Sequence, residues 1–223
     1  MRLTTTRLTA KGEATRQRIL EGAAEVIREA GVGDTTLDDI RMRTATSKSQ
    51  LFHYFPSGRD ELLLAVAQFE ADRVLSDQQP HLSDLTTWES WQQWRAALIR
   101  RYRKQGSTCP MAVLMSELGR TDPAAQAVTR SLLLRWRSDL ATGVRSMQAT
   151  GAARASLDAD RFAGAIVAGI QGGVAILLAT DSSADLEAVL DVLLDQLRTR
   201  QDVAASTQNT AKPPNNSRAR GPR

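Results

Sequence analysis

Apolar residues recur every three or four positions along most of the chain, which is the spacing expected for helices that bury one face. Glycine, proline and short polar stretches interrupt this pattern. The pattern predicts helices over approximately residues 12–30, 36–44, 47–54, 60–75, 85–104, 123–149, 158–179 and 184–200.

The two shortest predicted helices meet across a tight break at residues 44–46. Leu37 and Ile40 share one face of the first helix, and Leu51 and Phe55 share one face of the second. Each helix also begins with a capping box, in which two side chains satisfy free backbone N–H groups. The candidate pairs are Thr36 with Asp39, or Thr35 with Asp38, for the first helix and Ser47 with Gln50 for the second. This is the layout of a helix-turn-helix, whose second helix enters the DNA major groove.

The net charge of the 223-residue chain is only +4, which is too small to indicate a nucleic-acid partner by itself. Its distribution is more informative, because residues 41–59 hold four basic residues and no acidic one. Such a patch beside a groove-sized helix suits the phosphates of DNA. A solvated face on an ordinary helical hairpin explains the spacing and the charge about as well, so both interpretations stay open at this point.

Three segments, taken in order and at their spacing, resemble the DNA-binding domain of the tetracycline-repressor (TetR) family. They are residues 15–24 (TRQRILEGAA), 36–40 (TLDDI) and 47–55 (SKSQLFHYF). The resemblance implies an all-α, dimeric transcription factor, usually a repressor that a small ligand releases. Together with composition, it divides the chain into a flexible arm (1–11), a helix-turn-helix DNA-binding domain with three helices (12–67), a helical ligand-binding and dimerisation domain (68–200) and a disordered tail (201–223).

The chain departs from the family pattern near the turn. The family usually has glycine where this chain has Ala45, and a left-handed alanine costs about 1 kcal/mol. The phosphate-binding tyrosine of the family is replaced by Phe52, and Tyr54 is a candidate for the missing hydroxyl. The lysine that often opens the next helix is absent from residues 56–59, where Arg59 is the expected substitute. These departures put the phosphate contacts in question rather than the fold.

The exposed first turn of the second short helix is expected to read base edges. Lys48 suits guanine or a phosphate, and Gln50 suits adenine, although Gln50 is also needed in the capping box. Thr36, Tyr54 and Arg59 are expected to anchor phosphates, and His53 either contacts DNA or is a surface imidazole without a task. The predicted DNA-binding residues are Thr36, Ser47, Lys48, Ser49, Gln50, Phe52, His53, Tyr54 and Arg59.

Tryptophans mark the first helix of the second half. Trp88, Trp91 and Trp94 lie three positions apart and follow one side of that helix. They are either core residues or the lining of a cavity for a flat or cationic ligand, which an indole face can bind. Trp136 in the next long helix is a further candidate for the ligand pocket.

The segment from Cys109-Pro110 to Glu117-Leu118 resembles one found in a TetR subgroup. Met111 and Met115 share a helix face there, and methionine suits either a pocket that accepts several ligands or an ordinary core. Cys109 is the only cysteine, so no internal disulfide is possible and a cytoplasmic location is expected. Nothing nearby clearly lowers the pKa of Cys109, which speaks against a reactive thiol.

The last two predicted helices are rich in small and aliphatic residues. Glycines and alanines allow close helix packing, and the nearly continuous leucines and valines of the final helix cover more than one buried stripe. A homodimer through a four-helix interface explains this pattern better than a monomer core. The apolar stretch at residues 162–179 is interrupted by glycines, so we expect a buried helix and no membrane span, and residues 1–10 lack the apolar core of a signal peptide.

The favoured function is therefore a ligand-responsive, DNA-binding transcriptional regulator, with double-stranded DNA and a small-molecule effector as partners. An enzyme is disfavoured, because the sequence shows no paired carboxylates in a plausible site, no metal-ligand cluster and no phosphate loop, and its histidines, His53 and His81, lie far apart. No cofactor is expected. A helical interaction module that has lost DNA binding is the third hypothesis. The effector, the operator and the sign of regulation do not follow from the sequence.

Overall fold

The computed structural model describes residues 8–105 and 122–198, and the regular elements in these ranges are helices. The all-α prediction is therefore confirmed. The elements are α1 (Ala10–Asp34), α2 (Leu37–Thr44), α3 (Lys48–Tyr54), α4 (Arg59–Ser76), the short 3-10 helix η1 (His81–Ser83), α5 (Trp88–Gln105), α7 (Pro123–Ala149), α8 (Ala159–Thr180) and α9 (Ala184–Leu197). The predicted tail, most of the predicted arm and residues 109–118 lie outside the described ranges.

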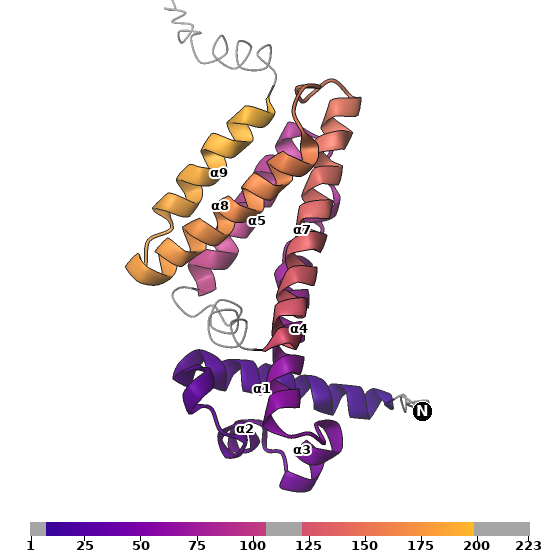
Figure 1. Ribbon diagram of the computed structural model, residues 1–223, viewed down its shortest axis with the longest axis vertical. Helices are drawn as coiled ribbons and strands as arrows, with labels where there is room; N and C mark the ends of the chain where they lie inside the picture. Colours follow the sequence, from indigo (N-terminus) through magenta and orange to yellow (C-terminus); the bar gives the residue numbers. More distant parts are fainter. Residues whose placement is uncertain (1–7, 106–121, 199–223) are drawn as a thin grey trace, which may run out of the picture.

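The described helices form two groups that α4 joins (Figure 1). Helices α1, α2 and α3 lie around the beginning of α4. Further along α4, α7 packs against it, α8 packs against α7 and α9, and α9 also contacts α5. Two clusters of buried apolar side chains correspond to these groups, and they divide within α4, between Ala67 and Ala71. One continuous helix therefore contributes to both cores.

The end of α1 is shaped by a glycine. Gly31 has φ 83° and ψ 167°, which breaks the helical geometry before a last turn that ends at Asp34. The sequence pattern predicted an end at Ala30, immediately before this kink. A positive φ of this size is readily accessible to glycine, which lacks a Cβ atom.

Helix α8 is the most apolar element of the described chain. It is long and apolar enough to cross a membrane by length and composition alone, which is weak evidence, since the core helix of a water-soluble protein meets the same test. It packs against α7 and α9. The approach to α9 is close at Gly173, where an added Cβ would lie 2.7 Å from the Cα atom of Leu186. Small residues on α8 therefore position α9.

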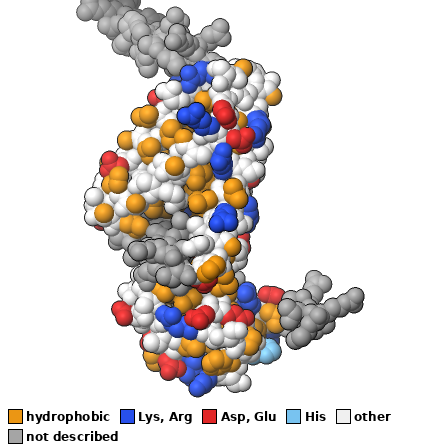
Figure 2. Space-filling view, viewed as in Figure 1, with side chains coloured by type: hydrophobic (Ala, Val, Ile, Leu, Met, Phe, Trp, Pro, Cys, Tyr) orange, Lys and Arg blue, Asp and Glu red, His pale blue; other side chains and the backbone are white. Residues whose placement is uncertain are grey.

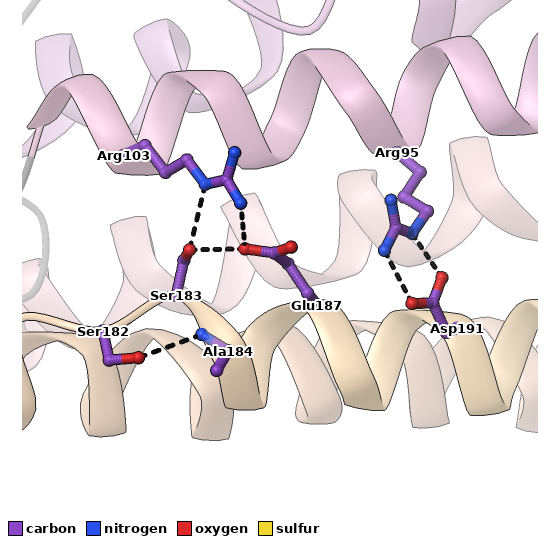
Figure 3. A network of polar contacts seen from close by, with 7 residues as sticks. All are labelled: Arg95, Arg103, Ser182, Ser183, Ala184, Glu187 and Asp191. Carbon is purple, nitrogen blue, oxygen red and sulfur yellow. Dashed lines mark hydrogen bonds and ion pairs between the residues drawn. The ribbon is translucent and has the colours of Figure 1, made fainter.

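Ion pairs hold α9 against α5 (Figure 3). The guanidinium of Arg95 lies 2.6 Å from the carboxylate of Asp191, and Arg103 pairs with Glu187 at the same distance. The hydrogen bonds that Ser183 and Arg103 donate lower the pKa of Glu187. These acidic residues line the side of α9 that faces α5, while Ala188 and Val192 on α9 are exposed.

Candidate nucleic-acid interface

Capping boxes fix the starts of α2 and α3. At α2, the backbone N–H of Asp39 donates to the Thr36 hydroxyl at 3.2 Å, and the N–H of Thr36 donates to the Asp39 carboxylate at 3.1 Å. At α3, Gln50 N–H donates to the Ser47 hydroxyl at 3.1 Å, and Ser47 N–H donates to the Gln50 side-chain oxygen at 3.2 Å. Of the two pairs that the sequence allowed for α2, the structure has Thr36 with Asp39.

The turn between α2 and α3 passes through a left-handed alanine. Ala45 has φ 47° and ψ 44°, which is the left-handed conformation that glycine adopts more readily than alanine. Thr44 and Thr46 on either side are buried, and their hydroxyls hydrogen-bond to each other at 2.9 Å. The Thr44 hydroxyl lies 2.7 Å from the carbonyl oxygen of Ile40. The turn is thus closed by side chains that need no water.

Helix α1 approaches this turn closely through a glycine. A Cβ added at Gly22 would lie 2.3 Å from Cγ2 of the buried Thr44, a distance that real contacts do not reach. Gly22 belongs to the segment on which the family resemblance rests. Because Gly22 has no side chain, α1 can pack directly against the turn that orients α3.

The first turn of α3 is exposed, as the helix-turn-helix layout requires. Lys48, Ser49 and Gln50 are all exposed, whereas Leu51 is fully buried in the N-terminal core. Gln50 uses its side-chain oxygen in the capping box, and paired hydrogen bonds to adenine need that same oxygen together with the amide nitrogen. Adenine contacts by Gln50 would therefore compete with the cap.

Most of the basic residues in this region have partners within the protein. Arg41 pairs with Asp38, and Arg43 pairs with Glu29 at 2.5 Å and Glu25 at 3.3 Å. Lys48 has no such partner among the described residues. The local positive charge that the sequence suggested is consequently smaller than the count of arginines and lysines implies.

Arg59, the expected phosphate anchor, makes hydrogen bonds within the protein. Its Nε donates to the carbonyl oxygen of Thr35 at 3.1 Å, and its Nη2 donates to the carbonyl oxygen of Val32. The half-buried Arg59 therefore links the start of α4 to the end of α1, where backbone carbonyls lack helical partners. Arg59 thereby joins two helices of the N-terminal group.

Three of the other predicted contacts, Phe52, His53 and Tyr54, lie on α3, and Thr36 caps α2. Phe52 is 39% exposed and His53 is exposed, while Tyr54 is half-buried against the N-terminal core. The rings of His53 and Tyr54 meet edge to face, with centroids 4.9 Å apart. The Thr36 hydroxyl donates to the Asp39 carboxylate at 2.5 Å, so the cap uses it on both sides.

Met42 is a surface residue that the sequence analysis missed. Its side chain is 76% exposed, and it borders a hollow of about 620 Å³ together with Arg41, Ala45 and Ser47. A methionine on a short amphipathic helix is normally assigned to the core. The signal that distinguishes it is its position next to the exposed Arg43, away from the helix face that carries Leu37 and Ile40.

The ligand-pocket candidates divide into three groups. Trp91 and Trp136 are fully buried in the C-terminal core, and their indole N–H groups have no hydrogen-bond acceptor among the described residues. Trp88 is half-buried, and the guanidinium of Arg198 lies 4.7 Å from its ring centroid. Met111 and Met115 lie outside the described residues. The neighbouring Trp94, in contrast, donates to the buried side chain of Gln78 at 2.8 Å.

Helices α2 and α3, joined by a tight turn and packed on α1, form a helix-turn-helix in which the first turn of α3 is capped and exposed. This arrangement defines a helix-turn-helix DNA-binding protein. Two family models match the chain: "Bacterial regulatory proteins, tetR family" over residues 19–66 and "Tetracyclin repressor-like, C-terminal domain" over residues 86–193. The chain belongs to the TetR family of transcriptional regulators, which typically bind DNA and respond to ligands.

Individual relatives have low sequence identity to this chain and match only part of it. An uncharacterized HTH-type transcriptional regulator of Mycobacterium tuberculosis is 28% identical over 110 residues, which cover 47% of this chain and 53% of the relative. The regulator SrpR of Pseudomonas putida is 35% identical over 81 residues, covering 36% of this chain and 38% of SrpR. The chain therefore spans about half the length of the first curated relatives that it matches.

Solved structures agree with the fold over most of the chain. A TetR transcriptional regulator from Chloroflexus aurantiacus has a TM-score of 0.72 and 25% identity, covering 84% of this chain and 96% of its own. SmeT, described as the repressor of the Stenotrophomonas maltophilia multidrug efflux pump SmeDEF, has a TM-score of 0.65 and 18% identity, covering 85% of this chain and 93% of SmeT. The second likeness concerns the fold alone.

Proposed function

We propose that this protein is a cytoplasmic, ligand-responsive repressor that binds a near-palindromic operator as a homodimer. The observation that supports this most directly is the geometry of α2 and α3. Two complete capping boxes and the left-handed Ala45 present the first turn of α3 to solvent, on a core that α1 and α4 complete. A two-fold dimer presents two such turns to successive major grooves.

Lys48, Ser49 and Gln50 are the proposed base-contacting residues, with Ser47 capping the helix that carries them. Thr36, Phe52, His53, Tyr54 and Arg59 complete the proposed interface. Because Arg59 and Thr36 are already engaged within the protein, we assign them mainly to positioning α4 and α2. Lys48 is exposed and has no partner among the described residues, so it can contact either a guanine or a phosphate.

The proposed dimer interface is the outer face of α8 and α9. Hydrophobic side chains gather on the face of the molecule that carries these two helices (Figure 2). Exposed small and apolar residues recur at helical spacing, namely Ala165, Ala168, Gly172, Ala175, Ile176 and Ala179 on α8 and Ala188 and Val192 on α9. Such a contiguous apolar face is uncommon on a monomer. In a C2 dimer, it would pack against its own copy to form a four-helix interface.

The proposed effector site lies at the tryptophans of the C-terminal core. Trp91 and Trp136 each bury an indole N–H without an acceptor among the described residues, and buried donors of this kind usually have a partner. A flat ligand with acceptor groups would supply one. The proposed set of pocket residues remains Trp88, Trp91, Met111, Met115 and Trp136.

A quantitative mobility-shift assay on the DNA upstream of the gene tests the proposed function. Lys48→Ala and Gln50→Ala should each weaken specific binding by about 1–3 kcal/mol, and the slope of affinity against salt should fall for Lys48→Ala. Arg130→Ala, an exposed arginine on α7, is the control and should bind as the wild type does. Unchanged binding by both α3 variants would contradict the proposed interface.

A helical interaction module without DNA binding is the second candidate. The observation that favours it is the pairing of Arg41, Arg43 and Arg59 within the protein, which leaves few free cations beside α3. This candidate would be supported if the protein did not bind DNA, or if its affinity for DNA did not change with salt concentration. Phosphate contacts must weaken as salt rises.

A further inference from the structure

A cleft lies at the junction of the two helical groups, on a part of the molecule that the proposed DNA and effector sites do not use. Figure 1 shows the C-terminal end of α5 descending towards α1, beside α4. The cleft between these helices has a volume of about 620 Å³. This lies within the range of roughly 300–1,000 Å³ that small-molecule sites occupy.

Most of the charged residues that line the cleft are cationic. Arg28 of α1, Arg73 of α4 and Arg100, Arg101 and Lys104 of α5 contribute five positive charges, against the two carboxylates of Glu70 and Asp77. Glu70 lies 3.3 Å from Arg73, and Asp77 lies 3.1 Å from Arg101. Arg28, Arg100 and Lys104 have no carboxylate within ion-pair distance among the described residues. An excess of three positive charges therefore remains in the cleft.

Two buried donors of the cleft lack an acceptor. Nε of Arg28 and Nη1 of Arg101 are both inaccessible to water and have no hydrogen-bond partner among the described residues. They come from α1 and α5, on opposite sides of the domain junction. A buried guanidinium N–H without an acceptor is costly, and such groups usually indicate an ion or water that completes them.

We propose that this cleft binds a small multivalent anion, whose phosphate or carboxylate groups accept hydrogen bonds from Arg28 and Arg101 and pair with Arg100 and Lys104. The planar guanidinium group of arginine can donate two parallel hydrogen bonds to a phosphate or to a carboxylate. The anion would touch α1 of the DNA-binding half and α5 of the other half, beside α4, which belongs to both. Its affinity therefore depends on how the two halves are arranged, and by linkage it changes the affinity for DNA.

Titration calorimetry of the full-length protein tests the site, with inorganic pyrophosphate and citrate as separate probes at constant ionic strength. We expect saturable binding of one anion per chain, and the stronger probe identifies phosphate or carboxylate as the preferred group. Arg100→Gln combined with Lys104→Gln should weaken this binding by about tenfold or more, since it removes both exposed cations. Neither side chain makes a hydrogen bond or ion pair within the described protein, so the fold should persist, which circular dichroism verifies.

The matched control is Arg130→Gln combined with Arg161→Gln, which removes the same charge from exposed positions outside the cleft. Glu70→Gln supplies a change of opposite sign, because it removes the carboxylate from the wall of the cleft and should tighten anion binding. An equal loss in the control pair, or no saturable binding of either probe, would overturn the proposal. A Glu70→Gln variant that binds more weakly would also contradict it.

The second half of the inference, the effect on DNA, rests on the proposed function. At constant ionic strength, a saturating anion should change the operator affinity of the wild type by about fivefold or more and that of Arg100→Gln/Lys104→Gln not at all. Binding of the anion without any change in DNA affinity would refute the regulatory role. The substitutions at Arg100 and Lys104 lie on α5 and leave α3 unchanged. If this double variant binds the operator in the absence of anion but does not respond to the anion, the proposed function stands and only the cleft is affected. If neither the wild type nor the variant binds DNA, the proposed function itself fails.

Discussion

At the scale of single residues, the conformation of Ala45 is the clearest departure from a favoured backbone. Its φ of 47° places an L-residue in the left-handed region, where alanine is disfavoured relative to glycine by about 1 kcal/mol. Ala45→Gly should therefore raise the free energy of unfolding by about 0.5–1 kcal/mol, less what glycine adds to the entropy of the unfolded chain. Urea unfolding with unchanged m-value measures this. A destabilised Ala45→Gly variant would mean that the turn is not left-handed in solution.

Gly22 gives a second prediction at the same scale. Ala at this position would place its Cβ against Thr44, whose hydroxyl bonds fix its rotamer, so α1 and α2 must separate. Gly22→Ala should cost about 1–3 kcal/mol, as overpacking usually does. Gly33→Ala is the control, since nothing lies within 4 Å of an added Cβ there. Equal midpoints in thermal unfolding for the two variants would contradict the close contact.

At the scale of elements, the free faces of α8 and α9 lead to a prediction about assembly. Val192 is 64% exposed and Ile176 is 43% exposed, on the sides of their helices that do not contact α5 or α7. Val192→Asp combined with Ile176→Asp should convert the proposed dimer to monomer and weaken operator binding, because buried unpaired carboxylates are costly. Ala127→Asp on the exposed side of α7 is the control. Sedimentation analysis that finds both variants dimeric would place the interface elsewhere.

The order and limits of the elements were largely predictable from the sequence, but the tasks of the charged residues were not. Periodicity and caps located α2, α3 and α7 to within a residue or two, because these signals are local. The partners of Arg43, namely Glu25 and Glu29, lie on another helix, and those of Arg59 are backbone carbonyls. Such contacts depend on how helices pack, which a single sequence does not specify. The same limit applies to Trp91 and Trp136, whose complete burial needed the assembled core.

At the scale of the whole molecule, Glu70 joins the two halves electrostatically. Burial raises its pKa, although Arg73, Arg28 and Arg101 act in the opposite direction and Asp77 adds to the rise. A carboxyl whose pKa is higher in the folded state favours folding below its ordinary pKa of 4.5 and loses that contribution as pH rises through the folded value. Glu70→Gln should therefore raise the melting temperature at neutral pH. This gain in melting temperature should shrink below about pH 4.5, where Glu70 of the wild type is protonated and therefore as neutral as the glutamine that replaces it. A difference that does not change with pH would contradict this assignment.

The shared course of α4 has a consequence for dissecting the protein. Ala71, Val74 and Leu75 belong to the C-terminal core, yet they follow Ala67 of the N-terminal core on the same uninterrupted helix. A fragment that ends at Ser76 would carry these side chains into water, and one that ends at Ala67 would lose the last turns that brace the helix. A fragment with only the N-terminal helices therefore either exposes apolar side chains or has an unstable end of α4. A minimal DNA-binding fragment should keep α4 to Ser76 and replace the apolar residues at that end.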